Sequence, residues 1–334
     1  MKRWFKILVV LVVLVAIALM SADILWWFPF HELSKGQLAI VGDSGTGVGI
    51  YLLDLSHGSW RQLPTGDLLP WDFAWSPDGK KIAFTYSTVG GYDSDYVVGV
   101  AILNLENMET AKVYVSPSSN ETLNAVTWSL DGQSLIFDVY GNNDLIAFQR
   151  LDIQTGELQR IPFPQNIRPQ YFGINHIEVA QNNDYVIGGP DGVYVVPPNL
   201  GSLYPITPYE EGFFLTPDRK EITTPCAQSL FCNYNIDTGK LTQIYRGGPP
   251  IAGNWSYGGA DDLVAGNWSY DGKNVVYLLR GGGIDDPEYV VLADMMIKQN
   301  YEVYKTQPRY EVYKPQGRIE GSVSLLRLAW HSVK

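Results

Sequence analysis

The chain has 334 residues, a formal net charge of -11 at pH 7 and 46% hydrophobic residues. The hydrophobic content excludes a disordered chain. The acidic balance argues against nucleic acid or an anionic membrane surface as the main partner, because both bind clustered Lys and Arg. The 33 glycines, 20 prolines and 21 tyrosines are typical of many short strands joined by turns.

The first 30 residues form a unit separate from the rest. Three basic residues among the first six precede an apolar run at 7–20, and Asp23 is the only charge from there to Phe30. We predict a signal anchor, a single transmembrane helix within 1–30, followed by a linker at 31–36. The basic residues place the rest of the chain on the extracytoplasmic side of the membrane. A cleaved signal peptide is the alternative.

A repeated motif divides the remainder of the chain. The segment FAWSPDGKKIAF at 73–84 has two strong copies further along and two weaker ones. A fixed period with divergent members is the signature of a repeat architecture. The strong copies are VTWSLDGQSLIF at 126–137 and GNWSYDGKNVVY at 266–277, and the weaker ones lie at 215–219 and 180–184.

The spacing of the motif fits one blade of a β-propeller. Asp78 and Asp131 are 53 residues apart, as are Asp218 and Asp271, and this length suits a four-stranded blade. Each copy predicts the turn between the first two strands of a blade, with Asp capping the turn and Gly at positive φ. We interpret the motif residues as structural: Trp75, Asp78, Gly79, Trp128, Asp131, Gly132, Asp218, Trp268, Asp271, Gly272 and Trp330.

Six alternating runs with tight polar turns supply the outer strands of the blades. We therefore predict an all-β fold over 37–334, a six-bladed propeller of four-stranded antiparallel blades. The C-terminal strand, at 324–334, joins the N-terminal strand, at 37–43, to complete the first blade. Seven blades are the alternative, because AGNWSY occurs twice near the last blade. The runs are 50–63, 98–115, 145–161, 192–207, 230–245 and 289–304.

The segment WSPDGKKIAF, together with runs such as YLLDL, resembles the TolB-type propeller repeat. This WD-like repeat is also found in the propeller domains of prolyl-oligopeptidase relatives. The resemblance covers about residues 40–330 and implies the propeller fold. It leaves the function open, because members of this family bind proteins, gate peptidases or have no assigned role.

Two cysteines, Cys226 and Cys232, flank a short loop between two strand-like runs. Strands joined in this way bring their Cα atoms close, and an exported location permits oxidation. We predict a disulfide between them. Two free thiols are the alternative.

The loops on the two faces of the propeller differ in length. Strands alternate in direction, so the short turns share one face and the long connections share the other. Function on a rigid scaffold is usually carried by such long loops. The candidate ligand-binding residues are Tyr92, Asp93, Asp95, Trp255, Tyr257, Asp261, Asp262, Asp285 and Asp286. The alternatives are solvated loop groups or a Ca²⁺ site on Asp93 with Asp95 or Asp285 with Asp286, although neither loop has calcium-loop spacing.

Catalytic signatures are weak. The segment GDSGTG at 42–47 resembles the nucleophile segment of chymotrypsin-like proteases, but the required His and Asp pattern is missing, and the four histidines are scattered. We predict no catalytic residues, no metal and no cofactor. The predicted function is a monomeric, membrane-tethered propeller that binds an envelope protein, peptide or glycan and no nucleic acid. The alternatives are a partner subunit gating a peptidase or transporter, and a hydrolase or lyase with a carboxylate site, with or without a metal, at the channel mouth.

Overall fold

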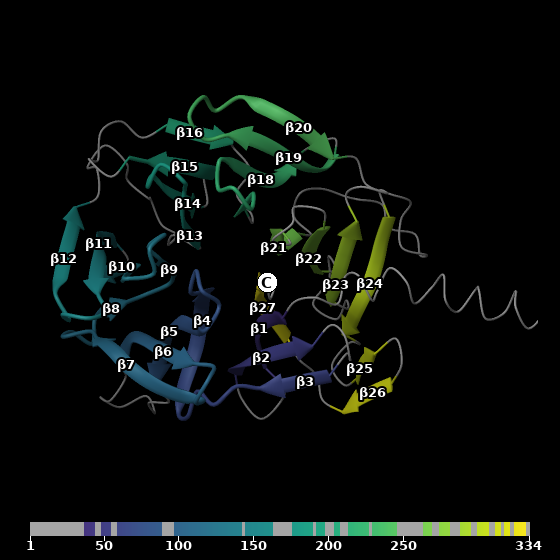
Figure 1. The fold of residues 1–334 in the computed structure, drawn as a ribbon. Coiled ribbons are helices and arrows are strands. Elements are labelled where there is room, and N and C mark those ends of the chain that lie inside the picture. The colour runs from purple at the N-terminus through teal and green to yellow at the C-terminus, as the bar shows by residue number, and fades with distance from the viewer. Residues whose placement is uncertain are drawn as a thin grey trace, which may run out of the picture.

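In the computed structural model, the described residues form a ring of antiparallel sheets (Figure 1). The part of the chain described contains strands and turns and no helix, so the predicted all-β propeller is confirmed. The structure describes residues 37–43, 48–54, 59–88, 97–141, 144–162, 176–189, 192–197, 204–207, 213–226, 229–245, 263–268, 274–280, 288–294, 299–306, 311–314, 317–320 and 324–331.

The first and last strands of the ring belong to one sheet. Strand β27 (Ser324–His331) pairs with β1 (Gln37–Asp43), and β2 (Val48–Asp54) and β3 (Ser59–Gln62) follow outward. Trp330 lies opposite Leu38 in this antiparallel ladder. The predicted closure of the first blade by the C-terminal strand is therefore confirmed.

Three further sheets have the predicted order of four strands. In each sheet, the strand nearest the centre of the ring is the inner strand (Figure 1). The three sheets consist of β4 (Leu68–Trp75), β5 (Lys81–Thr88), β6 (Val98–Asn104) and β7 (Glu109–Val115); β13 (His176–Val179), β14 (Tyr185–Gly189), β15 (Gly192–Val196) and β16 (Tyr204–Thr207); and β17 (Phe214–Leu215), β18 (Glu221–Cys226), β19 (Ser229–Asn235) and β20 (Leu241–Tyr245).

The sheet between β7 and β13 has an interrupted inner strand. Two short pieces, β8 (Glu121–Thr122) and β9 (Val126–Trp128), pair with different parts of β10 (Ser134–Gly141). Strands β11 (Asp144–Asp152) and β12 (Leu158–Pro162) complete the sheet. Residues 123–125 form the interruption, so their amides need partners outside the ladder.

The last sheet departs from the predicted unit because it has six strands. They are β21 (Leu263–Trp268), β22 (Asn274–Arg280), β23 (Glu288–Asp294), β24 (Gln299–Thr306), β25 (Glu311–Lys314) and β26 (Gly317–Glu320). The long connection expected after residue 304 contains the two added strands. Five sheets therefore follow the four-stranded unit, rather than the predicted six.

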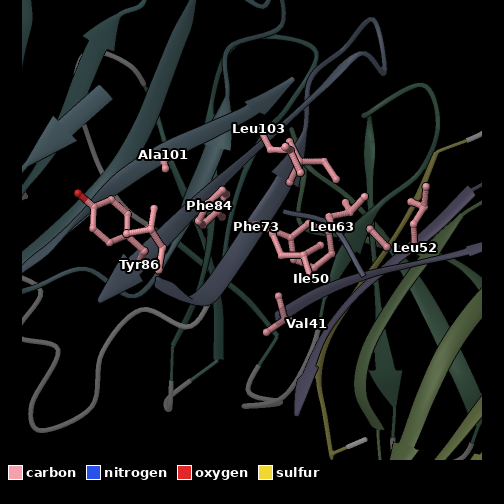
Figure 2. Close-up of a cluster of buried hydrophobic side chains, with 12 residues drawn as sticks. Val41, Ile50, Leu52, Leu63, Phe73, Phe84, Tyr86, Ala101 and Leu103 are labelled. Atoms are coloured by element: carbon pink, nitrogen blue, oxygen red, sulfur yellow. The ribbon is translucent and has the colours of Figure 1, made fainter. Parts of the chain in front are cut away.

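The hydrophobic core lies between neighbouring sheets. Val41 and Ile50 of the first sheet pack with Leu63 against Phe73 and Phe84 of the β4–β7 sheet (Figure 2). All five side chains are buried, and burying each large one contributes about 1.5–3 kcal/mol. Equivalent clusters join the next sheets as far as the β17–β20 sheet, so these five sheets pack against one another in sequence.

The predicted membrane segment at 1–30 and the linker at 31–36 lie outside the described residues. Among the strands and turns that are described, there is no helix long and apolar enough to cross a bilayer.

Candidate functional site

The repeated motif forms a hydrogen-bonded corner between an inner strand and the second strand. Ser76 Oγ donates to Asp78 Oδ1 at 2.6 Å, and the Lys80 amide donates to the same oxygen at 3.0 Å. The Lys81 amide donates to Ser76 Oγ at 2.9 Å, and Gly79 has φ of 69°. The Ser76 hydroxyl is the main cause that lowers the pKa of Asp78. These polar groups are therefore occupied in the turn and do not project toward a ligand.

The same corner recurs in the next sheets. Ser129 donates to Asp131 at 2.6 Å, with Gly132 at φ of 68°, and Thr216 donates to Asp218 at 2.7 Å. The bond from Ser129 is again the main cause that lowers the pKa of Asp131. The recurrence of these contacts fits a scaffolding role for the motif.

The motif tryptophan of the β8–β12 sheet links two blades. Trp128 is only 4% exposed, and its Nε1 donates to the Ala74 carbonyl of the neighbouring inner strand at 3.1 Å. The indole ring also packs with buried residues of both sheets, among them Ala83 and Val126. Trp128 thus serves as an inter-blade wedge.

Arg219 replaces the motif glycine in the β17–β20 sheet and adopts φ of 57°. Its Nη2 lies 2.5 Å from Glu178 Oε2, and its Nε donates to the Val179 carbonyl, so it binds the neighbouring inner strand β13. His176 Nε2 lies 3.4 Å from the other Glu178 oxygen. Burial alone would raise the pKa of Glu178, but Arg219 and His176 outweigh it and lower the pKa to about 2.

This cluster gives Arg219 a structural role at the position that glycine holds in the strong copies of the motif. The structure shows that Arg219 keeps the left-handed turn and adds an ion pair between blades. The sequence did carry a signal for this ion pair: a long cationic side chain stands at a motif position, and the inner strand of the preceding sheet carries Glu178.

A second polar cluster fills the interruption between β8 and β9. Asp138 Oδ1 accepts from the amides of Asn124 and Ala125, both at 2.8 Å. Asp72 Oδ2, from the neighbouring sheet, accepts from the Val126 amide at 3.0 Å. Both carboxyl groups are buried, Asp138 completely. Two carboxyl groups from two blades thus satisfy three consecutive amides that the ladder leaves unpaired.

The pKa of Asp138 is well above that of an ordinary aspartate. Burial is the largest cause that raises its pKa, the charge of Asp72 raises it further, and the bonds from Ala125 and Asn124 oppose both effects, which leaves the pKa at about 8. The Asp138 carboxyl is therefore largely protonated at neutral pH. Its Oδ2 has no hydrogen-bond partner among the described groups.

Trp71, directly before Asp72, is a large apolar side chain exposed on the inner strand β4. It is 49% exposed and lies where the β4–β5 register shifts, between Pro70 and Phe73. Its Nε1 donates to Ser87 Oγ at 3.0 Å. A bulge of this kind re-aims a side chain, and the bond to Ser87 fixes the indole. Strand alternation in the sequence gave no sign of it.

Trp71 lies on the half of β4 away from the corner. Its partner Ser87 is next to the end of β5, where the chain enters the connection 89–96. The exposed indole is therefore nearer to the end of β5 that lies away from the corner than to the corner itself.

The candidate residues chosen from the sequence lie elsewhere in the chain. Tyr92, Asp93, Asp95, Trp255, Tyr257, Asp261, Asp262, Asp285 and Asp286 are all outside the described residues, and so are their predicted roles in binding a ligand or Ca²⁺. Within the described ranges, no group of three or more His, Cys, Asp or Glu side chains is placed to hold a metal ion.

One of the two cysteines can be placed. Cys232, on β19, is buried and disulfide-bonded, and Cys226, on the paired strand β18, is the chain's other cysteine. Their strands are joined by a tight connection in which Cys226 lies opposite Ser229.

Comparison with known proteins gives distant likenesses. No protein-family model matches the chain. Over 179 residues the chain is 24% identical to dipeptidyl-peptidase 5 of Porphyromonas gingivalis, a match that covers 52% of this chain and 25% of that protein. The chain therefore spans only a quarter of the length of this relative.

Solved structures of other proteins have a similar fold over most of the chain. TolB from Acinetobacter baumannii has a TM-score of 0.60 at 16% identity, covering 89% of this chain and 67% of TolB. An oligogalacturonate lyase in complex with manganese has a TM-score of 0.53 at 14% identity, covering 86% of each chain. At such low identity these likenesses speak for the fold alone, and together with the ring of sheets they show a β-propeller, the fold that TolB also has.

Proposed function

We propose that the protein is a binding module that recognises a protein, peptide or glycan through the long-loop face of its propeller. The observation that carries this proposal is Trp71, an exposed indole held in place by Ser87 on an otherwise buried inner strand. Tryptophan is enriched at binding hot spots because it offers a large, rigid contact area. The Ser and Asp side chains of the corners are occupied in turns, so they support the scaffold.

The β21–β26 sheet is part of this proposal as the sixth blade. It lies between the β17–β20 sheet and β27 in Figure 1, and its inner strand ends at Trp268, the motif position. On this interpretation β25 and β26 are an addition to the outer edge of a regular blade.

Photocrosslinking tests the binding proposal. The full chain, produced in its native host, carries p-benzoylphenylalanine at Trp71 or, as a control, at Leu241, which is 48% exposed on the outer strand β20. We expect a discrete crosslinked species for position 71, at several-fold higher yield than for position 241. Identical patterns at the two positions would contradict a binding surface at Trp71.

We further propose that the propeller is tethered to a membrane on its extracytoplasmic side by residues 1–30. The support is the apolar run that follows the basic N-terminus. The mass of the mature protein tests this proposal. We expect an intact N-terminus in the membrane fraction after alkaline extraction, whereas a shortened chain in the soluble fraction would show cleavage.

An enzyme with carboxylates at the channel mouth is the second candidate. It draws on the fold shared with the oligogalacturonate lyase and on the match to part of a dipeptidyl-peptidase. Of the buried carboxyl groups described, Asp72 and Asp138 bind backbone amides, so catalysis would fall to loop residues. Turnover of oligogalacturonate or dipeptide substrates by the purified chain would favour this candidate over a binding module.

A further inference from the structure

The strand interruption at 123–125 is closed by two acidic side chains that belong to different blades. Asp138 comes from β10 of the same sheet, and Asp72 comes from β4 of the neighbouring sheet. Together they accept from three consecutive amides of the inner strand. The bond from Val126 to Asp72 joins the two blades at this point, and a negative charge on Asp138 opposes the charge of Asp72.

The surroundings disfavour two negative charges. Asp138 is completely buried, and Asp72 is only 1% exposed. Phe148 of β11 lies opposite Asp138 in the sheet, and the nearby hydroxyl of Thr85, on β5, accepts from the Asp72 amide at 3.1 Å. Among the described residues, Asp72 is the titratable group whose charge acts on Asp138. The buried charge of Asp72 therefore disfavours ionisation of Asp138.

We propose that Asp138 carries a proton at neutral pH, and that release of this proton loosens the contact between the β4 and β8–β9 inner strands because the new charge repels Asp72. The proton resides on Asp138 Oδ2, because Oδ1 already accepts two amides. This device is independent of which ligand the propeller binds.

The raised pKa of Asp138 makes the stability of the folded chain depend on pH. The pKa of Asp138 is about 8 in the folded chain against an ordinary 3.8, so between these values the folded state binds more protons than the unfolded state. The stabilising contribution of the proton is complete below pH 3.8 and is lost as the pH rises toward 8. Above pH 8 the contribution changes no further.

The substitution Asp138→Asn tests whether a proton on Asp138 stabilises this contact. The amide keeps an oxygen for the two backbone donors and removes the titration. We expect the melting temperature of the wild type to fall relative to that of Asp138→Asn between pH 5 and pH 9. The matched control is Asp131→Asn. Asp131 lies at an exposed corner and its pKa is lowered, so the difference in melting temperature between this variant and the wild type is expected to stay constant over this range. Parallel profiles for wild type and Asp138→Asn would overturn the proposal.

A measurement on the wild type keeps the proposal testable if Asp138→Asn does not fold. Carbon-13 NMR of aspartate carboxyl groups is expected to show one resonance that titrates near pH 8. Hydrogen exchange of the amides at 124–126, referenced to the corner amides, is expected to accelerate above that pH. Carboxyl groups that all titrate below pH 6 would overturn the proposal.

Discussion

Replacing Trp128 with alanine is expected to lower the free energy of unfolding by about 3–5 kcal/mol, the range for removing a buried tryptophan. The indole is 4% exposed, lies between two sheets and donates to the Ala74 carbonyl. Its loss leaves a cavity and removes a hydrogen bond at the same contact. Urea unfolding at pH 7, followed by circular dichroism, measures the effect.

The substitution Trp128→Phe separates the two parts of this effect. Phenylalanine keeps most of the apolar volume and removes the Nε1 donor to Ala74. We expect a loss of about 1–2 kcal/mol, most of it from the lost hydrogen bond. If Trp128→Ala cost no more than Trp128→Phe, the wedge role of the ring would be wrong.

The substitution Arg219→Gly is expected to destabilise the propeller although it restores the glycine of the motif. Removing the guanidinium leaves Glu178, whose side chain is 14% exposed, without its closest cationic partner. Breaking a fully buried pair from one side costs about 3–5 kcal/mol, and the 34% exposure of the Arg219 side chain lowers the cost for this pair to about 2–3 kcal/mol. Relief of the left-handed backbone at φ of 57° returns about 1 kcal/mol. We therefore expect a net loss of about 1–2 kcal/mol in thermal or urea unfolding.

Asn183→Gly is the matched control for Arg219→Gly. Asn183 has φ of 68° at a corner without an ion pair of this kind, so glycine there is expected to change stability by less than about 1 kcal/mol. The folded pKa of Glu178 is about 2 against an ordinary 4.5. The stability from the pair is present above pH 4.5 and is lost toward pH 2, so the difference between Arg219→Gly and the wild type narrows there. Equal effects of both substitutions would contradict an energetic role for the ion pair.

The fold could be predicted because its determinants are local and repeated. A corner can be predicted from five consecutive residues, because the Ser and Asp that form its hydrogen bond are close in sequence. Examples are Ser76 with Asp78 and Ser129 with Asp131. The position of Trp330 at the motif register was enough to predict that β27 completes the first sheet. Turn chemistry of this kind depends on the residues of the turn themselves.

The candidate site could not be predicted because its determinants occur once and are distant in sequence. Asp72 and Asp138 meet across two sheets at a strand interruption, and neither belongs to the motif. Trp71 is exposed through a bulge, which period-2 alternation does not encode.

The six-stranded sheet was missed for a different reason. Its added strands include the second YEVYK segment, whose β-branched and aromatic residues favour a strand. Pro308 and Pro315 favour a loop for this region of the sequence, whereas the structure forms β25 and β26 there.

The pairing of β1 with β27 sets the order in which the ring can be completed during synthesis. The edge of β1 that finally contacts β27 is made early, and its partner is made only after the other described strands have been synthesised. Until then β1 carries an unpaired strand edge, the kind of surface that invites association with other chains. Contacts between such distant segments also form slowly, because closing so long a loop costs entropy. The β1–β27 seam is therefore where a chaperone or a truncated chain would have the greatest influence on whether the propeller assembles.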